Sequence, residues 1–123
     1  MSMQPFNKQD IKTVTQDEWA KLKENDEESK FANFSDQLFD PKPVIKLFDS
    51  WGPSTWLISQ CDDEGMAFGL CDLGQGFPEL GSVYLPSIVE ALGMRLEKDL
   101  YWEADKTLLE YSKIARKNQR IVS

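Results

Sequence analysis

The stretch STWLISQCDDEGMAFGLC, residues 54–71, decides the fold, because it contains two apolar segments joined by a short acidic turn. Residues 54–61 and 66–71 have the length and composition of strands, and DDEG has the composition of a turn. The stretch therefore predicts an antiparallel β-hairpin, from which the rest of the chain can be placed.

The register of this hairpin follows from its tip. With Asp63 and Glu64 at the tip, Cys61 lies opposite Met66 and Trp56 lies opposite Cys71. One face of the hairpin is the better core, and it carries Leu57, Ser59, Cys61, Met66, Phe68 and Leu70. The two cysteines are then expected on opposite faces and about 16 Å apart along the strands. Because a disulfide needs Cα atoms within about 7 Å, free thiols are predicted.

The flanking segments extend the hairpin into a sheet with helices. We expect further strands or extended segments at residues 43–48, 81–86 and 99–103. We expect helices at residues 16–25, 86–93 and 107–118. The predicted fold class is α+β: an antiparallel β-sheet meander of about four to five strands, packed with N-terminal, middle and C-terminal helices. Residues 1–42 are expected to form a helical or irregular N-terminal extension, and residues 43–123 the α+β core domain.

The first helix has a clear start but no clear end. Thr15 and Glu18 have the spacing of a capping box, and Trp19 and Leu22 lie on one face that we expect to be buried. Residues 25–29, NDEES, are interpreted as an acidic, solvated connector. Residues 31–43 are aromatic but irregular, and their phenylalanines are expected to cross the body of the domain.

Composition excludes several classes of function. The 123 residues contain no histidine, which removes Ser-His-Asp and Cys-His catalysis as well as the commonest metal ligand. No run approaches the roughly 20 apolar residues of a membrane span. The first residues lack the pattern of a secretory signal, so a cytoplasmic location is expected.

Charge is distributed unevenly along the chain. The formal charges are −3 over residues 1–42, −8 over residues 43–105 and +4 over residues 106–123, which give −7 in total. An acidic body repels the phosphate backbone, so direct nucleic-acid binding is not expected. A nucleic-acid module built on the basic helix at residues 107–118 is the least favoured alternative.

The loop CDLGQGFPELG, residues 71–81, is the first candidate site. It lacks the third glycine of a dinucleotide-binding motif, a following helix and a GK[ST] sequence, so phosphate binding is not predicted. Gly74 and Gly76 are expected to supply positive φ angles in a loop that joins two strands. The role of its carboxylates, Asp72 and Glu79, stays open between structure and function.

Exposed aromatic residues are the second signal. Trp51 lies in a turn beside glycine and proline, and tryptophan and tyrosine are enriched in binding hot spots. The predicted binding residues are Trp51, Asp72, Glu79, Tyr101 and Glu103. No catalytic residue, metal site or cofactor is predicted.

Three runs resemble an uncharacterised bacterial family, domain of unknown function 2958: PVIKLFDSWGPSTWLISQCD, FGLCDLGQGFPELGSVYLPSI and LEKDLYWE. The elements that carry the resemblance are Lys46-x-Phe48, Trp51, Thr55-Trp56, Phe68-Gly69-Leu70-x-Asp72, Pro78-Glu79-Leu80-Gly81 and Asp99-Leu100-Tyr101-Trp102-Glu103. The resemblance covers residues 43–105, and residues 1–42 are longer and more acidic than is usual in the family. Phenylalanine would be as usual as Trp102.

The resemblance implies a context, since such genes occur on conjugative plasmids, integrative elements and phages, often near anti-restriction genes. Our leading hypothesis is a small acidic accessory protein of a mobile genetic element that binds, and inhibits, a host defence or nucleic-acid-handling protein. The expected partner is thus a host or element-encoded protein, with no membrane. The alternative is a small-ligand binder or carboxylate-based enzyme with a site near Asp72 and Glu79.

Overall fold

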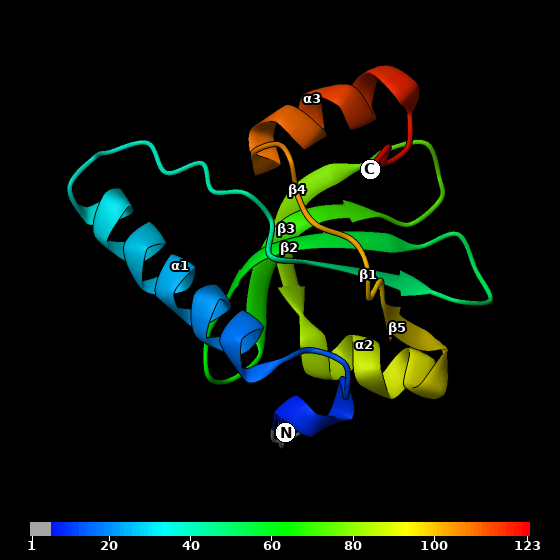
Figure 1. Cartoon of the computed structure of the whole chain (residues 1–123). Coiled ribbons are helices and arrows are strands. Elements are labelled where there is room, and N and C mark those ends of the chain that lie inside the picture. Colours follow the sequence, from blue (N-terminus) through cyan, green and yellow to red (C-terminus); the bar gives the residue numbers. More distant parts are fainter. Residues whose placement is uncertain (1–5) are drawn as a thin grey trace.

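The computed structural model describes residues 6–123 and shows one five-stranded antiparallel sheet with the strand order β4-β3-β2-β1-β5 (Figure 1). The strands are β1 (Ile45–Asp49), β2 (Thr55–Cys61), β3 (Met66–Asp72), β4 (Glu79–Tyr84) and β5 (Leu96–Lys98). The helices are α1 (Gln16–Phe34), α2 (Leu85–Leu92) and α3 (Leu108–Asn118), with short 3₁₀ turns at Lys8–Asp10 and Gly93–Arg95. The predicted α+β class, with N-terminal, middle and C-terminal helices, is confirmed.

The last strand lies earlier in the chain than predicted. The sequence suggested an extended segment at residues 99–103, but β5 is Leu96–Lys98 and residues 99–103 form a turn and an irregular segment. The carboxylate of Asp99 accepts the N–H of Tyr101 at 3.2 Å, which bends the chain away from β1. The prediction of a strand there was wrong because this local turn competes with extension.

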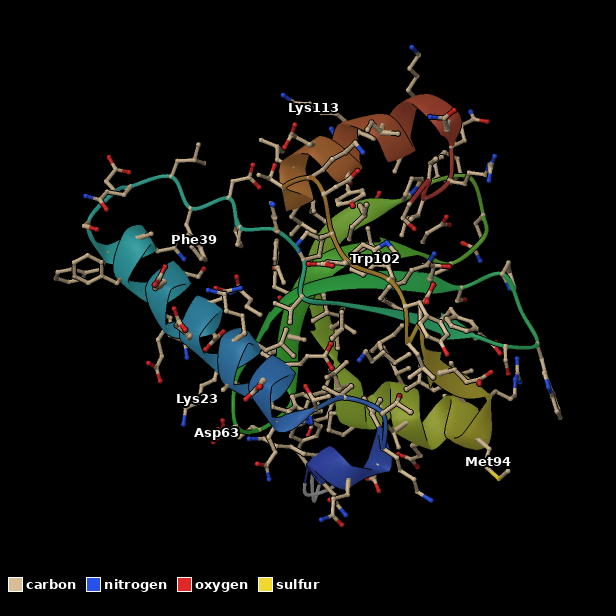
Figure 2. All side chains as sticks on the ribbon, in the orientation of Figure 1. Lys23, Phe39, Asp63, Met94, Trp102 and Lys113 are labelled. Carbon is tan, nitrogen blue, oxygen red and sulfur yellow. The ribbon has the colours of Figure 1, made fainter. Side chains whose placement is uncertain are left out.

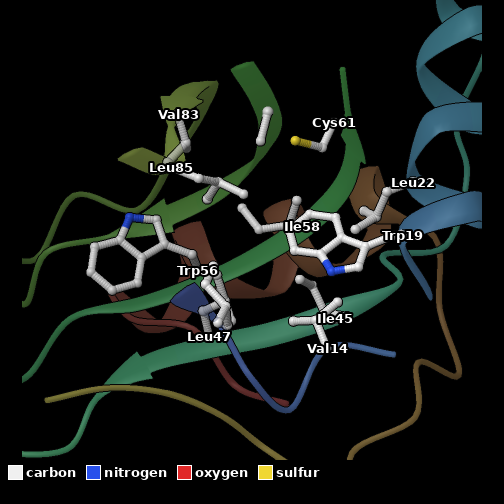
Figure 3. Packing of buried hydrophobic residues seen from close by; sticks show 12 residues of the cluster. Val14, Trp19, Leu22, Ile45, Leu47, Trp56, Ile58, Cys61, Val83 and Leu85 are labelled. Atoms are coloured by element: carbon white, nitrogen blue, oxygen red, sulfur yellow. The ribbon is translucent and has the colours of Figure 1, made fainter. Parts of the chain in front are cut away.

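The sheet is covered on both faces, so the face of the hairpin expected to be the better core is only one of two buried faces. On one face, α1 and α2 enclose a cluster with Trp19, Leu22, Ile45, Leu47, Trp56, Ile58, Val83 and Leu85, in which Ile58 lies between Trp56 and Trp19 (Figure 3). On the other face, α3 covers Leu57, Leu70, Leu108, Tyr111 and Ala115. Met66, assigned to the core, is 42% exposed. Burial on both faces makes β2 and β3 the apolar centre of the domain.

A β-bulge in β2 divides the predicted hairpin into two halves. Trp56 pairs with Cys71 and Ile58 with Gly69, as predicted, but the register then shifts by one residue at Ser59. Cys61 therefore joins the same cluster as Trp56, against which Cys71 also packs. The cysteines are free, as expected, but their assignment to opposite faces was wrong.

Helix α1 begins where the sequence predicts and ends much later. The capping box of Thr15 and Glu18 is present, and Trp19 and Leu22 are buried. The helix continues through residues 25–29, so the prediction of a solvated connector there was wrong. Asn25 is buried and its side chain donates to the C=O of Ser59 at 2.9 Å, which docks the polar middle of α1 on the bulge.

The end of α1 projects its aromatic residues outward. Phe31 is 67% and Phe34 91% exposed, contrary to the expectation that these phenylalanines cross the body. The chain turns at Asp36, whose φ of 57° allows the N–H of Gln37 to bond the C=O of Ala32. The N-terminal region, of which residues 1–5 lie outside the described residues, thus contributes Trp19 and Leu22 to the main cluster and also an exposed helix end.

The two shorter helices follow the sequence closely. Helix α2 ends at Gly93, whose φ is +55°, and α3 begins with a second capping box formed by Thr107 and Glu110. Arg116 and Lys117 lie in the last turn of α3, where the helix dipole favours cations. Within residues 6–123, no helix combines the length and the apolar character that crossing a bilayer requires.

Candidate functional site

A groove of about 540 Å³ lies between α1, the segment 38–41, the sheet and the start of α3. Its floor comes from β2, β3 and β4, on the same sheet face that α3 covers further along. The lining residues are Asp26, Ser29, Lys30, Asn33, Leu38, Phe39, Asp40, Pro41, Ser59, Gln60, Asp62, Met66, Ala67, Phe68, Leu80, Ser82, Leu108 and Leu109. Most of the surface that these residues present is apolar, which is typical of sites that bind side chains or small organic groups.

The floor of the groove is rigidly hydrogen-bonded. Ser59 is fully buried, and its hydroxyl donates to the C=O of Phe68 at 3.2 Å. The C=O of Ser59 accepts from Asn25, so the bulge is held from both sides. Because these polar groups already bond one another, they leave the apolar surfaces of Phe68 and Leu80 as the available contacts.

The wall opposite α1 is the segment 38–41, which is tied to α3. The N–H of Leu109 donates to the carboxylate of Asp40 at 2.9 Å, and the N–H of Leu108 donates to the C=O of Pro41 at 2.9 Å. These bonds take up two of the amides that the first turn of a helix leaves free. Phe39, which also lines the groove, lies between α1 and the sheet (Figure 2).

Large exposed apolar side chains surround the groove. Leu38 is 89% exposed, Met66 42% and Leu109 37%, and all three contribute to the lining. Phe31 and Phe34, in the last turn of α1, are also exposed but do not line the groove. We name the three residues Leu38, Met66 and Leu109 the apolar rim. An apolar rim around an apolar groove is the feature that marks interaction sites on soluble proteins.

The surroundings of the groove are acidic. Asp26, Asp40 and Asp62 line it together with one cation, Lys30, whose amine lies 3.0 Å from Asp26. The hydrogen bond to Asp26 and the charge of this carboxylate raise the pKa of Lys30. Helix α1 and residues 62–64 together hold nine carboxylates and three lysines, a formal −6 of the chain's −7. Of these carboxylates Asp26 and Asp62 line the groove, and α1 meets the β2–β3 turn through the Lys23–Asp63 ion pair (Figure 2).

Asp72, a predicted binding residue, is buried at the end of β3. Its carboxylate accepts the N–H of Gly74 at 2.8 Å and the N–H of Ile121 at 2.9 Å. The first bond shapes the glycine loop, in which Gly74 and Gly76 have the predicted positive φ angles. The second attaches the C-terminal segment, so the observed contacts of Asp72 are structural.

Glu79 lies on the other face of the sheet from Asp72. It pairs with Cys71 across β3 and β4, and neighbours along a strand alternate between faces. Burial, and to a smaller extent the negative charge of Glu79, raises the pKa of the Cys71 thiol to about 11. An effect of Glu79 on Cys71 is expected when both side chains lie on one face of the sheet. The structure therefore does not bring the carboxylates of Asp72 and Glu79 together.

Trp51 is 82% exposed in the β1–β2 turn. Its ring centroid lies 5.6 Å from the guanidinium of Arg95, and its backbone N–H donates to the carboxylate of Asp49. The side chain of Arg95 also donates to the carboxylate of Asp49. This hydrogen bond has the largest effect in lowering the pKa of Asp49, and the bond from the backbone N–H of Trp51 has the next largest. The contacts with Asp49 and Arg95 thus fix Trp51 in its exposed position, although Trp51 does not line the groove.

Tyr101 and Glu103 lie on the irregular segment after β5, and Tyr101 is 95% exposed. Trp102 between them points inward and packs on Tyr111, with ring centroids 6.0 Å apart. The five predicted binding residues thus occupy separate turns and strand ends, and none of them lines the groove. Among the described residues, no cluster of three or more histidine, cysteine or acidic side chains could hold a metal ion.

The sequence interpretation missed the groove because its walls meet only in the folded chain. The available signal was the aromatic stretch FANFSDQLFDPKP, residues 31–43, which supplies Leu38 of the apolar rim and the segment 38–41. Its phenylalanines were expected to cross the body of the domain, although no regular apolar spacing supports burial there.

Comparison with known proteins identifies the family. No curated protein and no solved structure matches the chain. Residues 13–122 match a protein family described as "Protein of unknown function (DUF2958)", which includes α1 and α3 as well as the sheet. Because this match covers most of the chain, the protein belongs to the DUF2958 family.

Proposed function

We propose that this protein is a small acidic accessory protein of a mobile genetic element that binds a host or element-encoded protein through the groove and its apolar rim. Such binding would inhibit a defence protein or a nucleic-acid-handling protein. The proposal replaces the separate predicted binding residues with one continuous surface.

The observation that carries the proposal is the apolar rim. Large apolar side chains scattered singly are normal on protein surfaces, but Leu38, Met66 and Leu109 line one groove. Exposing them to water is unfavourable by about 25 cal/mol per Å² of apolar surface, and a partner would relieve this cost. Aromatic and aliphatic anchors beside a pocket are the usual centre of a protein interface.

The acidic surroundings support a protein partner with a basic surface. Asp26, Asp40 and Asp62, which line the groove, would steer such a partner toward it, with an effect that weakens as salt rises. A partner that normally holds nucleic acid has a basic surface of this kind. The rival carboxylate site is less well supported, since Asp72 and Glu79 leave the sheet on opposite faces.

The test is capture of a partner by matched variants. Wild-type protein immobilised at low salt is expected to retain a host protein that Leu38→Ser and Leu109→Ser variants do not retain. Met94→Ser is the control, because Met94 is 97% exposed and does not line the groove (Figure 2). The captured protein is then purified and its affinity measured for each variant at low and high salt. Equal affinity for the Leu38→Ser and wild-type proteins would exclude the groove as the binding surface.

A further inference from the structure

Strand β4 is an edge of the sheet, and the groove lies against it. We propose that the partner contributes an extended segment that pairs with β4 as a sixth strand, placing alternate apolar side chains in the groove. This inference rests on the proposed function and specifies how the groove is used. It also names the chemistry of the segment, which is apolar at alternate positions and basic elsewhere.

The backbone of β4 has hydrogen-bonding groups available for such a segment. The N–H of Leu85 donates to the C=O of Gly65 at 2.9 Å, in the same register that pairs Val83 with Ala67. Because hydrogen bonding alternates along an antiparallel strand, residues 79, 81 and 83 bond β3, whereas the N–H and C=O of Leu80 and Ser82 point outward. Within residues 6–123, no turn, loop or side-chain hydrogen bond uses the main chain of Leu80 or Ser82.

Strand β4 lacks the features that usually block an edge. Natural edge strands are protected by lysine, proline, a bulge or extreme shortness. β4 reads ELGSVY, pairs with β3 over six consecutive residues without a shift, and carries its one charge at the end, on Glu79. Such an edge is a template for strand addition, which is a common mode of peptide recognition.

The side chains of β4 connect this edge to the groove. Leu80 and Ser82 share one face of the strand and line the groove, about 7 Å apart. A strand added beside them would direct every second side chain onto this same face, next to Leu80 and Ser82 at the β4 side of the groove. The groove would thus provide specificity and the backbone bonds would provide affinity.

Gly81 is explained by the same arrangement. Four of the other six glycines have a positive φ. At the remaining two, Gly52 and Gly69, a Cβ would lie within 2.6 Å of another atom. Gly81 has neither constraint, and a Cβ built there meets no atom within 4 Å. Glycine inside a strand weakens it unless something approaches closely, and an incoming strand can cover this position with a large side chain.

Charge and shape favour a partner's segment over a second copy of this chain. Three carboxylates and one lysine line the groove, so the segment fits best with basic residues beside its apolar ones. A second β4 would offer only Leu80 and Ser82 to fill about 540 Å³. Each copy would also bring a formal charge of −7 to the contact.

The test uses a synthetic nonapeptide of alternating lysine and isoleucine. The comparison peptide is the same sequence N-methylated at alternate residues, so that the backbone along one edge of the peptide cannot donate hydrogen bonds. The protein variants are Ser82→Pro, which removes an outward N–H, and Ser82→Ala, which keeps it. Proline is tolerated where an edge N–H faces solvent, and circular dichroism would check that the variant folds. Affinity is measured by fluorescence anisotropy, and protection of individual amides by hydrogen exchange.

The wild-type and Ser82→Ala proteins are expected to bind the unmodified peptide, with the amides of Leu80 and Ser82 becoming protected. Ser82→Pro, and the N-methylated peptide on the wild type, should each weaken binding roughly tenfold or more. Equal binding of both peptides, or no binding of the unmodified peptide, would overturn strand addition. Because capture of the natural partner and its loss in Leu38→Ser are measured separately, such a result leaves the proposed function standing. A dimer of the free protein that Ser82→Pro dissociates would assign the edge to a second copy and overturn the inference.

Discussion

Replacing Asp72 with alanine tests whether this buried carboxylate serves the fold. The substitution removes two hydrogen bonds from backbone amides, those of Gly74 and Ile121. Bonds to a charged acceptor contribute about 1.5–3 kcal/mol each, but water can reach the exposed Gly74 amide, so the net loss should be about 3 kcal/mol. For a chain of this length that corresponds to a fall in Tm of roughly 10 °C. The Asp72→Asn protein keeps one acceptor oxygen and should lose about half as much.

Urea and thermal unfolding, followed by circular dichroism, would measure these differences. The matched control is Glu79→Ala, because Glu79 is exposed on the opposite face and its removal should cost less than about 0.5 kcal/mol. A loss below about 1 kcal/mol for Asp72→Ala, or an equal loss for both variants, would refute the structural role argued here. Partner capture by folded Asp72→Asn protein should match the wild type. A marked reduction would instead show that Asp72 also contacts the partner.

Three further predictions concern stability and reactivity. Asp36→Gly should stabilise the protein by about 1 kcal/mol, measured by urea unfolding, because aspartate has a φ of 57° there and glycine adopts this conformation without strain. Burial opposes ionisation of Glu18, but hydrogen bonds from Lys98 and from the backbone of Thr15 outweigh it and lower its pKa. Glu18→Gln should therefore reduce Tm at neutral pH, and the gap to the wild type should close as pH falls below 4.5, the ordinary value for this group. Burial raises the pKa of Cys61 to about 12 and of Cys71 to about 11, so both thiols should react with a disulfide reagent at pH 8 only after unfolding in guanidinium. Rapid reaction of the native protein would contradict their burial.

The sequence predicts those parts of the fold that local patterns control. The capping box at Thr15, the helix at residues 107–118 and the hairpin register as far as Ile58 all follow from neighbouring residues. The length of α1 does not, because the helix continues past its predicted end at Asn25, where the Asn25 side chain bonds Ser59, 34 residues away. Propensity alone cannot anticipate such tertiary contacts.

The candidate site was harder to predict than the fold. Its wall depends on Asp40 bonding the amide of Leu109, 69 residues further along the chain. Its floor depends on which residues of β4 face outward, which is determined by pairing with β3. Trp51 and Tyr101 are exposed, yet exposure of single residues does not show which of them share a surface.

The bulge at Ser59 restricts how the β2–β3 hairpin can vary in length. The extra residue at Ser59 returns Cys61 to the face of Trp56 and Ile58, so inserting one further residue between Ser59 and Cys61 would move Cys61 to the opposite face, out of the apolar cluster. Beyond Ser59 the hairpin should therefore tolerate insertions and deletions of two residues better than those of one. Homologous chains and designed loops should follow this even-numbered rule as long as Asn25 holds the bulge in place.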